Sequence, residues 1–244
     1  MVINYAHRGA SSYYPENTML SFEKAIELGC TGIETDVQMT KDGVLVLIHD
    51  HLLDRTTKGK GLVKDFTFAE LKKLDAGSFK DKSFSHCSIP SVEDLILLVQ
   101  NKNTIINFEI KSDIVLYENI EEKLIDMIYK FNMQQRVILS SFNHYSMVKC
   151  KEISKEIKTA LLYMEGLFKP EHYCNYTGAD ALHPYYPSLT KEIVDNAHGI
   201  GLAVNPYTIN DEKTMKQMLD LGVDGIITNY PDKLNTLLSV SNNN

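Results

Sequence analysis

The chain of 244 residues lacks the usual marks of a disulfide-rich, membrane-spanning or secreted protein. Its four cysteines are irregularly spaced and form no CxxC pair, which indicates reduced and partly buried thiols. No apolar run approaches the roughly 18 residues that a membrane span requires. The first residues contain neither the basic nor the apolar segment of a signal peptide, so we expect a soluble, cytoplasmic protein.

Basic side chains are outnumbered by acidic ones, and the formal net charge is -7. This balance argues against nucleic acid as a partner and against stable association with an anionic membrane. It leaves a small anionic substrate open, because a metal ion or a few cations can reverse the charge locally. The sequence contains no internal repeat, and it does not indicate an oligomeric state.

Short β-branched runs alternate with amphipathic stretches along most of the chain, which predicts parallel strands joined by helices. The predicted strands are residues 3–6, 32–39, 104–110, 137–140, 159–163, 181–183, 202–205 and 225–228. The predicted helices are residues 18–28, 118–131, 143–153, 191–198 and 211–221. Eight strands in this alternation favour one α/β domain over residues 1–244, folded as a (β/α)8 TIM barrel.

Residues 44–48 interrupt the alternation, because only four residues separate them from the second strand. Asp42-Gly43 is a strong hairpin signal, so we expect residues 44–48 to return antiparallel beside that strand. A two-residue turn at this point places Asp36 opposite His49. The more polar stretch that follows the hairpin is interpreted as an insertion rather than a second domain.

Charged side chains recur at the carboxyl ends of the early strands, and in a barrel these ends face one mouth, where the active site lies. These side chains are His7, Arg8, Glu34, Asp36, His49, Glu109 and Lys111. Each motif has an ordinary explanation by itself, such as a solvated strand face or a salt bridge. Their coincidence at one mouth is what predicts a site.

Burying these charges together is costly unless a cation neutralises the acids and an anion neutralises the bases. The three acids offer only oxygen ligands, which predicts one divalent cation, Mg²⁺ or Ca²⁺. The arginine fork and the lysine ammonium suit a phosphate group. His7 and His49 can exchange protons near neutral pH. This combination of groups predicts phosphodiester cleavage.

Several short motifs follow one another in a specific order along the chain. They are His7-Arg8-Gly9, Pro15-Glu16-Asn17-Thr18, Glu34-x-Asp36, His49-Asp50, Leu53-Asp54-Arg55-Thr56-Thr57, Phe108-Glu109-Ile110-Lys111 and Gly222-Val223-Asp224-Gly225. Together they resemble the glycerophosphodiester phosphodiesterase family over essentially the whole chain. The resemblance implies a TIM barrel with a small insertion, here about residues 51–90. It also implies metal-dependent hydrolysis of substrates such as glycerophosphocholine and glycerophosphoethanolamine to sn-glycerol 3-phosphate and an alcohol.

The same resemblance implies a metal site, a pair of acid–base catalysts and a phosphate site. The metal ligands are then Glu34, Asp36 and Glu109, the catalysts His7 and His49, and the phosphate ligands Arg8 and Lys111. Glu16 and Asn17 shape the loop over the site. A further histidine, His183, ends a later strand, where packing and a place in the pocket explain it equally well.

Two stretches depart from the family pattern. The usual Trp-Thr-Val-Asn run reads Tyr207-Thr208-Ile209-Asn210, and the chain contains no tryptophan. The usual Thr-Asp-x-Pro-Asp run reads Thr228-Asn229-Tyr230-Pro231-Asp232, which removes one charge. Tyr207 can still form a wall of the substrate pocket. Neither change is expected to touch the metal ligands or the two histidines, so both are expected to affect substrate choice rather than reaction type.

Two other functions fit the same motifs. A relative on this barrel that attacks lysophospholipids or sphingomyelin, as a lysophospholipase D or sphingomyelinase D does, needs an apolar rim around the mouth. Four phenylalanines of the insertion are candidates for this rim or for the core of the insertion itself: Phe66, Phe68, Phe79 and Phe84. A non-catalytic phosphodiester-binding protein is the second alternative, against which the complete set of acids and histidines argues.

Overall fold

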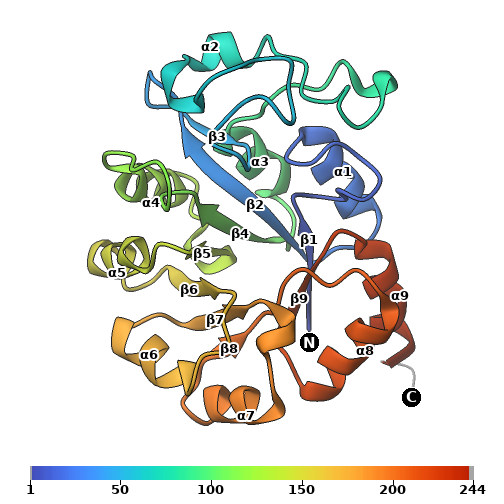
Figure 1. Ribbon diagram of the computed structural model, residues 1–244, viewed down its shortest axis with the longest axis vertical. Helices are drawn as coiled ribbons and strands as arrows, with labels where there is room; N and C mark the ends of the chain where they lie inside the picture. The colour runs from blue at the N-terminus through green and yellow to red at the C-terminus, as the bar shows by residue number, and fades with distance from the viewer. Residues whose placement is uncertain (1, 242–244) are drawn as a thin grey trace.

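Runs of buried aliphatic residues form the strands of one sheet in the computed structural model, which describes residues 2–241. These strands are β1 Ile3–His7, β2 Gly32–Met39, β3 Leu45–Leu47, β4 Ile105–Ile110, β5 Val137–Ser141, β6 Lys158–Tyr163, β7 Ala181–Pro184, β8 Ala203–Val204 and β9 Gly225–Thr228. All except β3 run parallel in the order β8-β7-β6-β5-β4-β2-β1-β9. Backbone hydrogen bonds from Asp224 to Val204 (2.9 Å) and from Ile227 to Pro206 (3.0 Å) bridge the remaining gap. The predicted TIM barrel is confirmed (Figure 1).

Helices surround the barrel and connect its strands (Figure 1). They are α1 Met19–Glu27, α2 Phe68–Leu71, α3 Val92–Val99, α4 Ile120–Lys130, α5 His144–Ile153, α6 Pro170–Thr177, α7 Lys191–Gly199, α8 Glu212–Leu221 and α9 Pro231–Ser241. Asn143 and Asp211 cap α5 and α8 through their side chains. The sequence did not predict α6, whose histidine, tyrosines, asparagine and threonine are weak helix formers, so its packing against the barrel decides its conformation.

The hairpin of β2 and β3 is antiparallel, as predicted, but its register differs by one residue. Val37 pairs with Leu47, and the amide of Ile48 donates to the carbonyl oxygen of Asp36 (3.1 Å). Asp36 therefore lies opposite Ile48, and the predicted pairing with His49 is wrong. The cause is a three-residue loop closed by Gly43, whose positive φ of 78° produces the longer turn.

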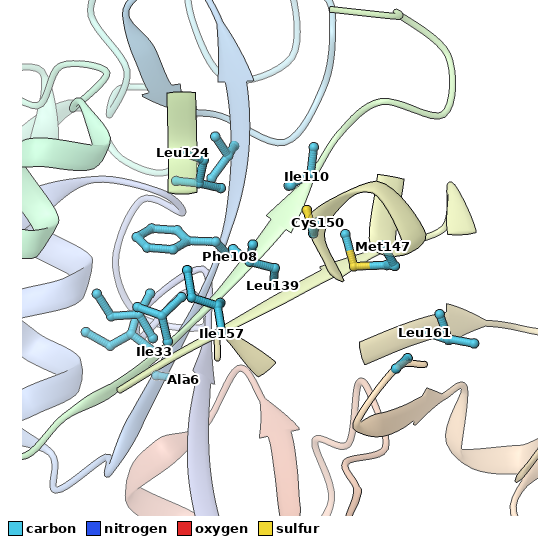
Figure 2. Packing of buried hydrophobic residues seen from close by; sticks show 14 of the residues in the cluster. Ala6, Ile33, Phe108, Ile110, Leu124, Leu139, Met147, Cys150, Ile157 and Leu161 are labelled. Carbon is cyan, nitrogen blue, oxygen red and sulfur yellow. The ribbon is translucent and has the colours of Figure 1, made fainter. Parts of the chain in front are cut away.

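Two hydrophobic cores hold the barrel together. One fills the interior and contains Tyr5, Ile138 and Ile227. The other lies between the strands and the surrounding helices, where Phe108 and Leu124 pack from β4 and α4 (Figure 2). All four cysteines are free and buried, in agreement with the sequence.

The polar stretch after the hairpin surrounds a small hydrophobic cluster of its own, built on Leu53, Val63 and Leu71. Phe66 and Phe68 pack against this cluster rather than around the barrel mouth. In Figure 1 the stretch, which includes α2, lies at one side of the barrel next to β3. None of the helices within residues 2–241 is long and apolar enough to cross a membrane.

Candidate active site

The last residue of β1 and the turn that follows it place His7 and Arg8 at the barrel mouth. Arg8 and Gly9 both have positive φ, 56° and 81°, a conformation that is uncommon for a residue with a side chain. A Cβ atom on Gly9 would lie 2.4 Å from Oγ of Ser21 in α1, so only glycine fits here. His7 and Arg8 consequently line a pocket of about 280 Å³ at the carboxyl ends of the strands.

Strand register brings three carboxylates together at this pocket, where Glu34 and Glu109 belong to the lining and Asp36 lies buried beside them. Parallel pairing sets Asp36 of β2 directly beside Glu109 of β4, and sets His7 of β1 beside Glu34 of β2. Oxygen atoms of Glu34, Asp36 and Glu109 lie within 4.8 Å of one another, and the three residues are 3%, 0% and 9% exposed. The three acids predicted to share a cation are therefore close enough to do so.

The three carboxylates repel one another, and burial removes the water that would solvate their charges. Both effects change their pKa values. Burial, then the charges of Asp36 and Glu109, raise the pKa of Glu34 well above its ordinary value. Burial also raises the pKa of Glu109, although Lys111 opposes this effect. For Asp36 the cations Arg8 and Lys111 outweigh burial and hold its pKa below the ordinary value. Such a group of oxygens is a natural site for a hard divalent cation.

Arg8 and Lys111 balance part of this negative charge. Nε of Arg8 lies 3.3 Å from Oδ2 of Asp36, and Nζ of Lys111 lies 2.7 Å from Oε1 of Glu109. Burial lowers the pKa of Lys111, but Glu109 and Asp36 outweigh it and raise that pKa above its usual range. Both side chains therefore stay positively charged in the pocket, where a phosphate group can replace a carboxylate as their partner.

A chain of charged groups orients His49. Its Nδ1 lies 2.6 Å from Oδ1 of Asp50, and its Nε2 lies 3.3 Å from Nζ of Lys111. Arg55 binds the other oxygen of Asp50 (2.6 Å) and both oxygens of Glu16, and Glu16 in turn accepts from Arg8 (2.9 Å). Burial raises the pKa of Asp50, but Arg55 and His49 outweigh it and lower that pKa to about 2. An ionised carboxylate therefore stands behind the His49 ring.

His7 has a neutral partner instead. Its Nδ1 lies 2.6 Å from Oδ1 of Asn229, and its Nε2 lies 3.8 Å from Oε2 of Glu34. The sequence-based expectation that the Asn229 departure touches neither histidine is wrong, because the chain after β9 returns beside β1 in the closed barrel. Burial, then the charge of Arg8, lower the pKa of His7 to about 4. The ring is consequently neutral at physiological pH.

The remaining predicted residues divide between the pocket and the core. Tyr207 lines the pocket, and its hydroxyl donates to the carbonyl oxygen of Tyr163 (3.1 Å). Asn17 donates to Oδ2 of Asp36 (2.8 Å), a hydrogen bond that fixes the position of this acid. His183 is fully buried within the barrel, between Asn107 (3.5 Å) and Asn205 (3.0 Å), and does not line the pocket.

Several pocket residues were not predicted. Four apolar side chains belong to the pocket lining: Phe142, Leu162, Met164 and Ile227. Asp50 and Arg55 were part of recognised motifs but had no assigned role. Their proximity in sequence to His49 is a signal for the first, whereas only the folded chain brings Arg55 to Glu16, 39 residues away.

The fold and this mouth define an enzyme of the TIM-barrel class with an acidic group that can bind a metal ion. Residues 7–233 match the model of the glycerophosphoryl diester phosphodiesterase family, and the chain belongs to this family. It is 47% identical to a glycerophosphodiester phosphodiesterase of Caldanaerobacter subterraneus subsp. tengcongensis, covering 96% of each chain. It is 43% identical to a protein of the same name from Bacillus altitudinis, covering 94% and 95%.

Solved structures agree with this assignment. An Oleispira antarctica phosphodiesterase in complex with the product sn-glycerol-3-phosphate superposes with a TM-score of 0.86 at 29% identity, over 96% of each chain. A putative glycerophosphoryl diester phosphodiesterase from Silicibacter pomeroyi superposes with a TM-score of 0.90 at 25% identity, over 99% and 94%.

Proposed function

We propose that the protein hydrolyses glycerophosphodiesters, such as glycerophosphocholine and glycerophosphoethanolamine, to sn-glycerol 3-phosphate and an alcohol. The observation that carries this proposal is the meeting of three carboxylates, two cations and two histidines around one pocket of about 280 Å³. Family membership and the product-bound relative support the same substrate class. We also propose that residues 1–244 form one domain, with residues 51–90 as an insertion.

Glu34, Asp36 and Glu109 would hold one divalent cation, Mg²⁺ or Ca²⁺. Oδ1 of Asp36 is buried and has no hydrogen-bond partner among residues 2–241, with Nζ of Lys111 3.7 Å away, so this oxygen can serve as a ligand for a cation. These three carboxylates would thus provide the phosphoryl group with a Lewis acid when a cation is bound. The hard, all-oxygen set favours these two ions above zinc.

Arg8 and Lys111 would bind the phosphate oxygens, and Tyr207 would contact the organic part of the substrate. Both cations already lie within 4 Å of acids in the pocket, so a phosphate can bind without long side-chain movements. Each would then face an anion on both sides, which keeps it charged and fixes its position.

His7 would act as the base and His49 as the acid. The bond of Nδ1 of His7 to the amide oxygen of Asn229 requires a proton on Nδ1, which leaves a lone pair on Nε2 toward the pocket. Nε2 of His7 can thus accept a proton from water or from the neighbouring glycerol hydroxyl. Nε2 of His49 accepts from Nζ of Lys111 in this structure (3.3 Å), so His49 would take up the acid role once Lys111 turns to the phosphate; ionised Asp50 behind the ring would then stabilise an imidazolium that donates a proton to the leaving alkoxide.

The test is turnover of glycerophosphocholine by wild type, His7→Ala and His49→Ala, with product formation followed by ³¹P NMR. Both variants are expected to fold, to bind the divalent cation and to lose about 10²- to 10⁴-fold in kcat. Near-normal turnover by either variant contradicts the histidine pair. A wild type that releases no sn-glycerol 3-phosphate with any of Mg²⁺, Ca²⁺ or Mn²⁺ contradicts the activity itself and favours the non-catalytic alternative.

Action on lysophospholipids or sphingomyelin receives no support from the insertion. Phe66 and Phe68 pack in its own cluster, and Phe84 stacks near Tyr14 at a ring distance of 5.9 Å. Of the four phenylalanines considered for an apolar rim, Phe79 is the one exposed above a third of its surface. Comparison of glycerophosphocholine with lysophosphatidylcholine as substrates separates the two activities.

A further inference from the structure

A second cavity opens beside the active-site pocket, between the segments that follow β5 and β6. Its volume is about 450 Å³, compared with about 280 Å³ for the pocket itself. Phe142 and Leu162 line both spaces, so the cavity continues directly from the pocket wall. A substrate whose phosphate lies at Arg8 can therefore extend its alcohol group into this side cavity.

The side cavity has a single formal charge among its lining residues, the carboxylate of Glu165. Nε2 of His144 in its wall donates to the carbonyl oxygen of Leu162 (2.8 Å), and Nδ1 of the same ring lies 3.2 Å from the hydroxyl of Tyr173. One oxygen of Glu165 accepts from the backbone amide of Met164 (3.2 Å), and the residue is exposed. The residues that line the cavity therefore contribute one negative charge and no lysine or arginine.

Aromatic rings make up much of the rest of the wall. Phe142 contributes a ring from the segment before α5, and Tyr173 contributes one from α6. Phe168, in the segment before α6, contributes a third ring and is 90% exposed. The face of Phe168 already attracts a cation, since Nζ of Lys169 lies 5.5 Å from its centroid. Aromatic faces together with a carboxylate attract ammonium and quaternary ammonium groups.

Glu165 also influences the pocket across the shared wall. Burial, then the carboxylates of Glu109 and Glu165, raise the pKa of Tyr207, whose ring packs edge-on against Phe142 at 6.0 Å. The acid of the side cavity is thus within electrostatic reach of the residue that we propose contacts the substrate.

We propose that the side cavity binds the leaving alcohol of the diester and that Glu165 selects alcohols that carry a positively charged nitrogen. This inference rests on the proposed function, because it assigns the part of the substrate beyond the phosphate. A hydrocarbon chain fits the rings as well, but it would remove water from the Glu165 carboxylate without replacing it, which is unfavourable. A cationic head group satisfies the rings and the carboxylate together.

A binding experiment tests the cavity independently of turnover. Binding of choline to the full chain is measured by ligand-observed NMR and compared with 3,3-dimethylbutanol, which has the same shape without the charge. We expect the wild type to bind choline more tightly than 3,3-dimethylbutanol. Glu165→Gln should weaken choline binding by about five-fold and leave the affinity for the neutral alcohol unchanged. Glu156→Gln is the matched control, since this exposed glutamate precedes β6 at the opposite end of that strand.

Turnover provides the second arm. With glycerophosphocholine and glycerophosphoglycerol as substrates, Glu165→Gln should lower the ratio of their kcat/KM values by about five-fold, through a higher KM for the choline diester. Equal binding of the two alcohols by the wild type, or an unchanged ratio in Glu165→Gln, overturns the proposal. If neither diester is hydrolysed, the proposed function fails, and the choline binding result still decides whether the cavity recognises cations.

Discussion

Nδ1 of His7 lies 2.6 Å from the amide oxygen of Asn229, although these residues are 222 positions apart in the chain. The neutral amide orients the ring but adds no negative charge behind it. With His7 buried next to Arg8, its pKa falls to about 4. The position that distinguishes this chain from its family pattern therefore acts on a proposed catalytic group.

Asn229→Asp should shift the acid limb of the pH–rate profile to higher pH. A base works only when unprotonated, and a carboxylate next to His7 favours its protonated form and so raises its pKa. We expect the acid limb of kcat/KM to move up by about one pH unit or more, with folding preserved. Steady-state kinetics between pH 4 and 8 measure the shift, and an unchanged acid limb contradicts the role of His7 as base.

Asp50→Asn should reduce turnover while leaving substrate affinity nearly unchanged. The substitution keeps the shape of the side chain but removes the charge that stabilises a protonated His49. We expect kcat to fall by about ten- to a hundredfold, part of the roughly 10²- to 10⁴-fold that acid–base catalysis contributes. Kinetics at several substrate concentrations separate kcat from KM. A change confined to KM would assign Asp50 to substrate binding instead.

Divalent cations should stabilise the wild type against heat, and Asp36→Asn should remove most of this effect. A ligand that binds only the folded state adds about 2.7 kcal/mol at one hundred times its Kd. Differential scanning fluorimetry after chelation, with Mg²⁺ or Ca²⁺ added back, gives the change in Tm without any assay of activity. Asp195→Asn on α7 is the matched control, and equal cation responses in both variants would rule out the proposed ligand set.

The buried His183 should make the protein less stable in acid. Burial lowers the pKa of His183 in the folded chain to about 3, whereas its pKa in the unfolded chain is roughly 6.5. Between these two pH values the unfolded chain binds a proton at this histidine and the folded chain does not. Stability is thus lost as pH falls from about 6.5 toward 3, by at most about 1.4 kcal/mol per pH unit from this group. Urea unfolding at pH 5, 6 and 7 should show a smaller slope for His183→Gln than for wild type. Parallel slopes would contradict this assignment.

The alternation of strands and helices and the acids at the strand ends were predictable because they depend on local pattern. Period-two and period-3.6 spacing identified all eight barrel strands, and residues two apart on a strand share a face whatever the rest of the chain does. The pairs Glu34 with Asp36 and Glu109 with Lys111 followed from this rule. The weakly helical α6 did not, since its conformation depends on the surface against which it packs.

What the sequence by itself determined is the barrel, the set of charged residues at its mouth and the resemblance to a family. The tertiary structure decided which of these residues touch: the one-residue register that separates Asp36 from His49, the amide behind His7, the Asp50–Arg55–Glu16 chain and the side cavity at Glu165. Two of these contacts join segments far apart along the chain, His7 with Asn229 and Arg55 with Glu16. Closing the barrel fixes their distances, and no local spacing rule contains that information.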